Sequence, residues 1–166
     1  MNRKGILVAW LTCGVLDITA ASIQARIQSG FTPDRVLKGV ASALWGPVAL
    51  KGGAVMAVIG LVMHFAVALT ATLVFAVLAS RITVLRTAPL WVIGPLYGAV
   101  VFCAMNYGTL PALSWLRTYY IPNAVPRWPG PMKWPQFLIH LVCVGLPIVW
   151  GVRRNHEAGQ ELRLAE

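Results

Sequence analysis

Four apolar stretches, each long enough to cross a lipid bilayer, constrain the fold of this 166-residue chain more than any other feature. They cover residues 5–27, 54–80, 90–110 and 135–152. A membrane-spanning helix needs about 20 predominantly apolar residues, because each residue advances the helix by about 1.5 Å across about 30 Å of hydrocarbon. The sequence therefore predicts an all-α integral membrane protein, a bundle of four transmembrane helices.

The composition agrees with this class. The chain is 58% hydrophobic and 11% charged, whereas a soluble domain is about 25% charged. We expect one transmembrane domain over residues 1–154 and a polar C-terminal tail over residues 155–166. The net charge of +9 does not indicate a nucleic-acid partner, because the Lys and Arg residues lie at span ends and in loops and no binding motif accompanies them.

The connections between the spans differ in character. Thr32-Pro33-Asp34 is a helix-start signal and Gly46-Pro47 a stop signal, so we predict a short amphipathic helix between the first two spans. It either lies in the membrane interface or packs on the bundle as a connecting helix. Residues 111–134 are rich in Pro, Trp and Tyr, which favours a loop along one membrane surface. Pro147 is expected to kink the fourth span.

An even number of spans places both termini on one side of the membrane. The Lys and Arg residues divide seven against seven between the two sides, so their count does not decide the orientation. On the side of the termini, more of them lie directly at span ends, which favours cytoplasmic termini. We therefore expect a multi-pass protein of the inner (plasma) membrane, with the lipid bilayer as its main partner.

Four polar residues lie inside the spans and are the candidate site: Asp17, His64, Asn106 and His140. We call the end of the bundle opposite the termini the distal end. Asp17 and His64 each lie ten residues from that end of their spans, about 15 Å deep. Asn106 and His140 lie four or five residues from it, about 6–8 Å deep. The sequence thus predicts two polar layers that open toward the distal end.

A charged Asp17 at this depth costs about 2.5–3.5 kcal/mol, so it needs a partner or a proton. His64, at the same depth, is the expected partner. Two interpretations stay open. The polar residues form a functional site, or they only make interhelical hydrogen bonds worth about 0.6–2 kcal/mol.

The possible chemistries of this site differ in what they require. A proton or ion path needs a carboxylate and imidazoles, which are present. A metal site needs three or more ligands at one depth, and the offset of about 7 Å expected between His64 and His140 also disfavours a shared haem iron. No catalytic motif is found. We therefore predict no cofactor, leave a metal site undecided, and lean against an enzyme.

The leading hypothesis is a small transport or ion-handling component with a buried polar pocket and an unknown ion or small-molecule ligand. The alternatives are a structural or accessory membrane protein and a metal- or haem-binding redox protein. Because four short spans leave little room for a transport path, a homo-oligomer is one expected form. Gly94-x-x-x-Gly98 is interpreted as packing within the bundle rather than as a dimer motif.

Short motifs spread over the four spans carry a resemblance to known proteins. In chain order they are Gly14-Val15-Leu16-Asp17, Lys51-Gly52-Gly53-Ala54, Leu61-Val62-Met63-His64-Phe65, Leu96-Tyr97-Gly98 with Met105-Asn106, and Leu138-Ile139-His140 with Gly145-Leu146-Pro147. In this set the chain resembles a family of small, uncharacterised four-span bacterial inner-membrane proteins that are distantly YagU-like. The resemblance covers roughly residues 5–152 and implies an inner-membrane helical bundle, with no activity, ligand or catalytic residue to carry over.

Overall fold

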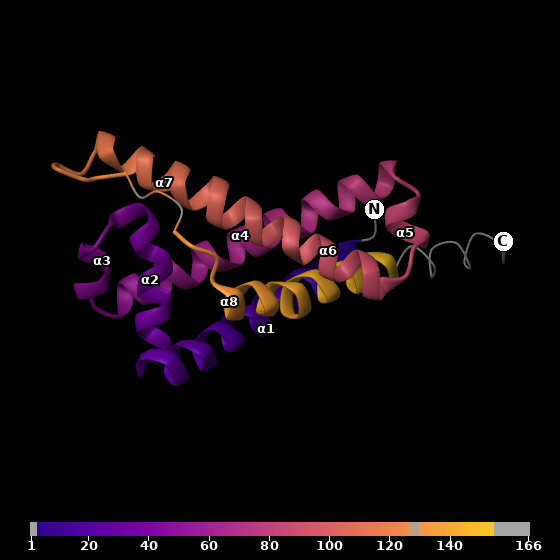
Figure 1. The fold of residues 1–166 in the computed structure, drawn as a ribbon, viewed down its shortest axis with the longest axis horizontal. Helices are drawn as coiled ribbons and strands as arrows, with labels where there is room; N and C mark the ends of the chain where they lie inside the picture. Colours follow the sequence, from indigo (N-terminus) through magenta and orange to yellow (C-terminus); the bar gives the residue numbers. More distant parts are fainter. Residues whose placement is uncertain (1–2, 127, 129, 155–166) are drawn as a thin grey trace.

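The computed structural model describes residues 3–126, 128 and 130–154, and over these residues the chain is helical and has no strand. Four helices are long and apolar enough to cross a membrane, namely Arg3–Ser29, Ala54–Arg81, Leu90–Tyr119 and Trp134–Arg154. They run along the long axis of the molecule, and the first and last described residues lie at the same end (Figure 1). This arrangement is compatible with an integral membrane protein, as the sequence predicts. The polar tail predicted at 155–166 lies outside the described residues.

The two later spanning helices are built from several helical segments. In chain order the elements are α1 (Arg3–Ser29), α2 (Pro33–Trp45), α3 (Val48–Lys51), α4 (Ala54–Arg81), α5 (Val84–Thr87), α6 (Leu90–Cys103), the π-helix η1 (Ala104–Thr109), α7 (Leu110–Leu116), the 3-10 turn η2 (Arg117–Tyr119), α8 (Trp134–Ile139) and the π-helix η3 (His140–Gly145). After η3 the helix continues to Arg154.

The third spanning helix is longer than predicted. We expected it to end at residue 110, with a surface loop over 111–134, but the helix continues through α7 and η2 to Tyr119. Pro111 does not end it, because it occupies one of the first two positions of α7, directly after a π-helix. A proline is tolerated at the start of an α-helical segment, where its missing N–H is not needed.

Each of the last two spanning helices contains a π-helix that ends two residues before a proline. η1 ends at Thr109, before Pro111, and η3 ends at Gly145, before Pro147. A proline ring collides with the carbonyl group four residues earlier in an α-helix, and the wider π turn relieves that collision. Where we expected a kink at Pro147, the structure therefore has a π-helix.

The amphipathic helix predicted after the first span is present as α2, with Pro33 in its first turn. It packs against α4 so closely that the Leu37 carbonyl occupies the space where a Cβ on Gly60 would lie. Its C-terminal carbonyls on Ser42 and Leu44 accept hydrogen bonds from Arg117 Nη1 at 3.3 Å and from the Tyr120 hydroxyl at 2.7 Å. The contacts are those of a connecting helix packed on the bundle. Its position relative to a membrane interface stays a prediction.

The half of the bundle nearer the termini is filled with apolar side chains. Its fully buried members come from three of the spanning helices: Ala9, Phe75, Ala76, Ala79, Ile148 and Val149. Close helix approach depends on glycine, since a Cβ on Gly94 would lie 2.5 Å from the Leu146 side chain and one on Gly98 would lie 2.8 Å from Leu141 Cα. These contacts confirm that Gly94-x-x-x-Gly98 packs within the bundle.

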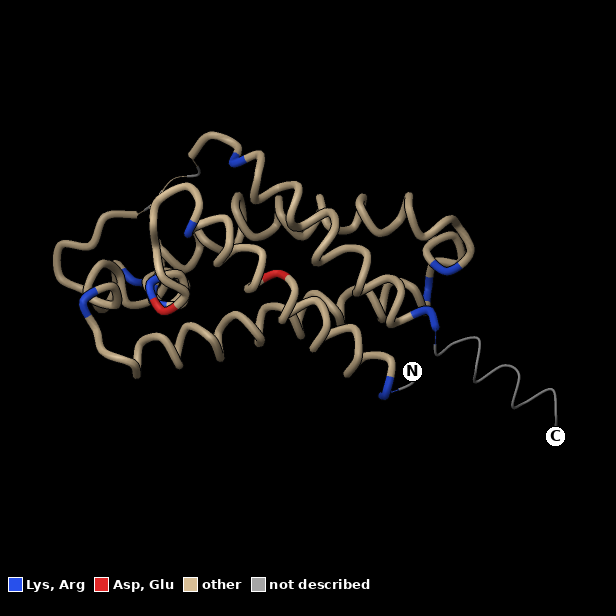
Figure 2. The backbone as a smooth tube through the Cα atoms, turned by 90° about the horizontal axis from the view of Figure 1, so that it is seen from below, with Lys and Arg blue, Asp and Glu red and all other residues tan. Residues whose placement is uncertain are grey.

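Basic residues gather at the two ends of the molecule, with a long uncharged stretch between them that is interrupted on the first helix by an acidic residue (Figure 2). At the end that holds the termini, Arg153 donates hydrogen bonds from Nε to the Leu85 carbonyl at 2.8 Å and from Nη1 to the Ala88 carbonyl at 2.7 Å. This arrangement of charge suits a slab of lipid around the middle of the bundle.

Candidate functional site

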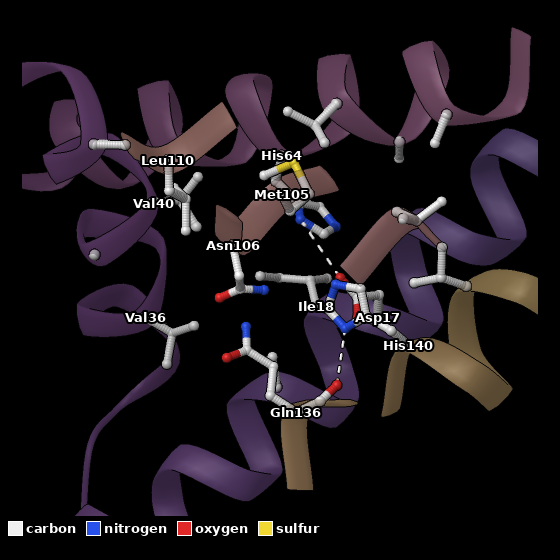
Figure 3. A pocket seen from close by; sticks show the side chains of 18 of the residues that line it. Asp17, Ile18, Val36, Val40, His64, Met105, Asn106, Leu110, Gln136 and His140 are labelled. Carbon is white, nitrogen blue, oxygen red and sulfur yellow. Dashed lines mark hydrogen bonds and ion pairs between the residues drawn. The ribbon is translucent and has the colours of Figure 1, made fainter. Parts of the chain in front are cut away.

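A cavity of about 400 Å³ opens in the distal half of the bundle, enclosed by α1, α2, α4, the third spanning helix and α8 with η3. All four candidate residues from the sequence line it: Asp17, His64, Asn106 and His140. Figure 3 shows Asp17, His64 and His140 converging at one end of the cavity. The topology therefore brings together, in one space, polar residues from all four spanning helices.

Asp17 is the centre of the polar cluster. Its Oδ2 lies 4.0 Å from His64 Nδ1, and its Oδ1 lies 3.8 Å from His140 Nδ1. The three side chains are largely buried, with exposed fractions of 16%, 12% and 10% for Asp17, His64 and His140. Among the described residues, Asp17 Oδ1 is a buried side-chain oxygen without a hydrogen-bond partner.

The depth expected for His140 is wrong. We placed it about 7 Å nearer the distal end than His64, whereas both imidazoles lie within 4.0 Å of the same carboxylate. The estimate assumed that the four spans end at one level. The distal end is uneven instead: α8 begins well inside the bundle, while α7 and α3 extend much further (Figure 1). At His140, directly after the last residue of α8, the chain has therefore reached the depth of Asp17.

The hydrogen bonds of His64 fix where its protons lie. Its Nε2 is 2.9 Å from the Gly14 carbonyl, and because a carbonyl oxygen only accepts, Nε2 carries a hydrogen. In the neutral ring Nδ1 then presents a lone pair to the Asp17 carboxylate, and two acceptors facing one another repel. A further proton, on Asp17 or on His64 Nδ1, removes this repulsion. The contact between Asp17 and His64 is therefore favourable only when one of the two facing atoms carries a hydrogen.

His140 is held by a local bond and by its neighbours. Its Nδ1 donates to the Gln136 carbonyl at 2.9 Å, one helical turn earlier. Its ring packs edge-on against Phe102, with centroids 5.4 Å apart. Because the Nδ1 hydrogen is used by the Gln136 carbonyl, Asp17 Oδ1 at 3.8 Å receives no hydrogen bond from His140.

Glycines on the facing helices allow both histidines to approach. A Cβ on Gly14 would lie 2.6 Å from the Phe65 ring, so only glycine lets α4 come close enough for His64 to reach the Gly14 carbonyl. A Cβ on Gly98 would meet the His140 carbonyl, so glycine lets the backbone of η3 lie against α6.

Three charged or amide-bearing residues of the cavity were not among the candidates from the sequence, namely Arg117, Lys133 and Gln136. All three had been assigned to a surface loop or to the start of a span. The signal that points to Arg117 is helical spacing, since residues 106, 110, 114 and 117 share one helix face once the helix is extended to Tyr119. The amides of Asn106 and Gln136 point toward each other across the cavity (Figure 3).

The deep end of the cavity is closed toward the termini. Its innermost lining includes Cys13, Ala71 and Val144, and beyond these lies the fully buried core around Phe75 and Ile148. Tyr97, at the same boundary, donates its hydroxyl to the Ala71 carbonyl at 2.6 Å. Packed apolar side chains therefore separate the polar cluster from the end that holds the termini.

Metal binding is not indicated by the geometry. Over residues 3–126, 128 and 130–154, no three His, Cys, Asp or Glu side chains are grouped closely enough to hold a metal ion. The Nε2 atom of His64 is already engaged by the Gly14 carbonyl, so that atom is not directed at a common metal position with His140.

No known protein family, curated protein or solved structure matches this chain. The resemblance to four-span, distantly YagU-like inner-membrane proteins therefore stays a prediction.

Proposed function

We propose that this chain is an integral membrane protein that takes up and releases a proton at Asp17, as an ion-handling or transport component. The observation that supports this most directly is the buried Asp17 carboxylate, which faces two histidine Nδ1 atoms at 3.8 and 4.0 Å and has one oxygen without a hydrogen bond. An ionisable residue inside the membrane is a functional hypothesis by default.

Two protonation states of the cluster follow from the hydrogen bonds. In one, either Asp17 or His64 Nδ1 carries a proton, and the pair is either neutral or an ion pair. In the other, that proton has left toward the cavity, and the carboxylate faces the His64 lone pair at 4.0 Å. The second state leaves a charged carboxylate inside the bundle, which is costly unless a ligand in the cavity provides a partner.

Water is the natural carrier of the proton. A water molecule occupies about 30 Å³ in the liquid, and the cavity of about 400 Å³ has room for several beside polar groups. Because the deep end is closed by Phe75 and Ile148, this arrangement favours a site open to one side over a continuous channel. Transport would require the apolar core of the terminal half to part.

The alternative of purely structural polar residues explains less of the geometry. Side chains that serve as interhelical hydrogen bonds are expected to be satisfied, as Tyr97 is by the Ala71 carbonyl. Asp17 Oδ1 is not satisfied in this way. A redox metal or haem protein is supported less, because His64 Nε2 and His140 Nδ1 are already engaged by the Gly14 and Gln136 carbonyls.

The location proposed with this function is the inner membrane of a bacterium, with cytoplasmic termini and with homo-oligomers as one possible form. Arg81, Arg86, Arg153 and Arg154 lie close to the ends of the spans on the side of the termini, which supports this orientation.

Infrared spectroscopy of the protein in lipid nanodiscs tests the proposal. Subtracting the Asp17→Asn spectrum from that of the wild type removes the bands of the four other carboxyl side chains. In this difference spectrum we expect a protonated-carboxyl band that rises and falls with pH, with equal yields of the two folded proteins. Asp34→Asn is the matched control, because Asp34 lies exposed on α2. No titrating carboxyl band in the wild-type minus Asp17→Asn difference spectrum at any pH would rule out Asp17 as the proton site.

A further inference from the structure

Charge is distributed unequally along the cavity. Asp17, His64 and His140 form its inner end, whereas Arg117 and Lys133 lie at its outer, distal end. Asp17 is the only acidic side chain among the described residues that line the cavity. A ligand that enters from the distal end therefore meets two permanent positive charges before it reaches the carboxylate.

The structure holds Arg117 in place at the outer end. Its Nη1 donates to the Ser42 carbonyl at 3.3 Å and its Nη2 to the Val125 carbonyl at 3.1 Å. A guanidinium has five N–H groups in a fixed fork, so these two bonds orient the charge without using all of its donors. A carboxylate is the group that such a fork recognises most readily.

The distance between the two ends can be estimated from α8. Lys133 is the N-cap residue of this helix, and His140, which lies beside Asp17, follows seven residues later. At about 1.5 Å per residue the backbone rises by about 10 Å between them. Apolar side chains line the space in between, among them Val40, Val67 and Leu110.

We propose that the cavity binds a small organic carboxylate that carries a hydrogen-bond donor, a hydroxyl or an ammonium group, at its far end. The carboxylate contacts Arg117 and Lys133, an apolar body of about six carbons spans the apolar walls, and the donor satisfies Asp17 Oδ1, the atom that lacks a partner among the described residues. The proposal rests on the proposed function, because it is the ionised Asp17 that accepts this bond.

The charged residues of the cavity disfavour a ligand that is only a cation or only apolar. A ligand that is only a cation would have to pass Arg117 and Lys133, and a ligand that is only apolar would leave the polar groups of both ends buried against hydrocarbon, which is costly. A carboxylate without the donor would bind at the outer end but would leave Asp17 Oδ1 without a hydrogen bond.

Four six-carbon probes separate these possibilities: ω-aminohexanoate, ω-hydroxyhexanoate, hexanoate and hexylammonium. Binding to the full chain in lipid nanodiscs is measured by equilibrium dialysis. We expect one or both donor-bearing carboxylates to bind about tenfold more tightly than hexanoate, the effect of one hydrogen bond to a charged group, and hexylammonium to bind most weakly. The tighter of the first two identifies the donor. Hexylammonium binding as tightly as the carboxylates, or no probe binding at all, would overturn the proposal.

Two variants test which end of the cavity binds the carboxylate of the ligand and which end binds its donor. Asp17→Leu removes the acceptor at similar shape, so it should lower the affinity for the donor-bearing probes to that of hexanoate while hexanoate itself is unaffected. Lys133→Gln, an exposed position, should weaken all three carboxylates about tenfold. Lys51→Gln is the control, because Lys51 is also exposed, at the end of α3. Equal effects of Lys133→Gln and Lys51→Gln would contradict the outer site.

The failure of this proposal and of the proposed function can be told apart. If the infrared band of Asp17 titrates but no probe binds, the ligand assignment is wrong and the proton site stands. If the probes bind and the Asp17 band is absent at every pH, the cavity is a ligand site that does not handle protons.

Discussion

Two glycines determine where the histidines of the candidate site lie. Gly14 accommodates the Phe65 ring and presents its carbonyl to His64, and Gly98 lets the backbone at His140 lie against α6. Neither glycine has a positive φ angle, so the requirement is one of space and not of backbone conformation. In a close-packed bundle, an added methyl group must push helices apart or force a side chain off its rotamer.

Gly98→Ala should therefore destabilise the bundle by about 1–3 kcal/mol and separate His140 from Asp17. Gly108→Ala is the matched control, because an added Cβ there meets nothing within 4 Å; we expect it to be neutral or to stabilise by up to about 1 kcal/mol. Thermal unfolding of both variants in the same lipid checks this. Equal stability of the two variants would mean that the close contact at Gly98 is relieved at no cost.

The hydrogen bonds of Asp34 on α2 predict the pH at which its carboxyl group titrates. Its hydrogen bonds from the Thr32 hydroxyl and from Lys38 at 2.9 Å lower the pKa of this carboxyl below its ordinary value. Because the pKa of Asp34 is lowered in the folded state, the ionised carboxylate stabilises α2. This stabilisation is fully present above the unfolded-state pKa and is lost as the pH falls through the folded-state pKa. An NMR titration should give a midpoint below the ordinary value, and Thr32→Val should raise it. An unchanged midpoint in Thr32→Val would show that the hydroxyl is not the cause.

At the scale of the element, the π-helices set the direction of two candidate residues. Asn106 lies within η1 and His140 begins η3, and each π-helix is followed by a proline. A π turn inserts one residue, which rotates the side chains before it by about 100° around the helix relative to those after it. The residues after η3 are held in the buried core, among them Ile148 and Val149, so the rotation falls on the side of His140. The face that His140 presents therefore depends on Pro147, although Pro147 is not among the residues that line the cavity.

Pro147→Ala should allow an ordinary α-helix to form and turn His140 away from Asp17, so that the titration of the Asp17 infrared band moves. Pro95→Ala is the control, since Pro95 lies inside α6 and not after a π-helix; its band should match that of the wild type. The interpretation of η3 would be wrong if both proline variants gave the wild-type titration.

The elements differ in how far the sequence predicts them. The four spans follow from hydropathy, because the bilayer sets the length of an apolar helix. The helix α2 follows from its capping residues, Thr32-Pro33-Asp34. The extension of the third helix to Tyr119 does not, because Pro111 resembles a stop signal unless the π-helix before it is known. Arg117 was therefore assigned to a loop, although it lines the cavity.

At the scale of the whole molecule, the bundle has a closed half and an open half. The apolar core around Phe75, Ile148 and Val149 fills the half nearer the termini, and the cavity occupies the distal half. Sequence reasoning placed the polar residues in the distal half but in two layers, because it counted depth from span ends that turned out to lie at different levels. The convergence of His64 and His140 on one carboxylate required the three-dimensional arrangement of the helix ends.

The closed half depends on Arg153, which joins the end of the fourth spanning helix to the carbonyls of Leu85 and Ala88. Arg153→Met should lower the free energy of unfolding by about 2–3 kcal/mol, since hydrogen bonds from a charged donor are lost. Arg154→Met should cost less than about 1 kcal/mol, because Arg154 contributes a cation–π contact to Trp150 at 5.1 Å on the surface. Thermal unfolding in lipid compares them. A smaller loss for Arg153→Met than for Arg154→Met would contradict this account.

The central claim is that Asp17 takes up and releases a proton inside the bundle and is coupled in this to the facing Nδ1 atom of His64. Nitrogen NMR of the histidine rings in lipid bilayers tests it most directly. A His156→Gln background leaves only the two imidazoles of the site. We predict that His64 keeps its Nε2 hydrogen throughout, and that the titration of its Nδ1 changes when Asp17 is replaced by Asn. Two rings that titrate independently, with the same midpoints in the wild type and in Asp17→Asn, would contradict this coupling.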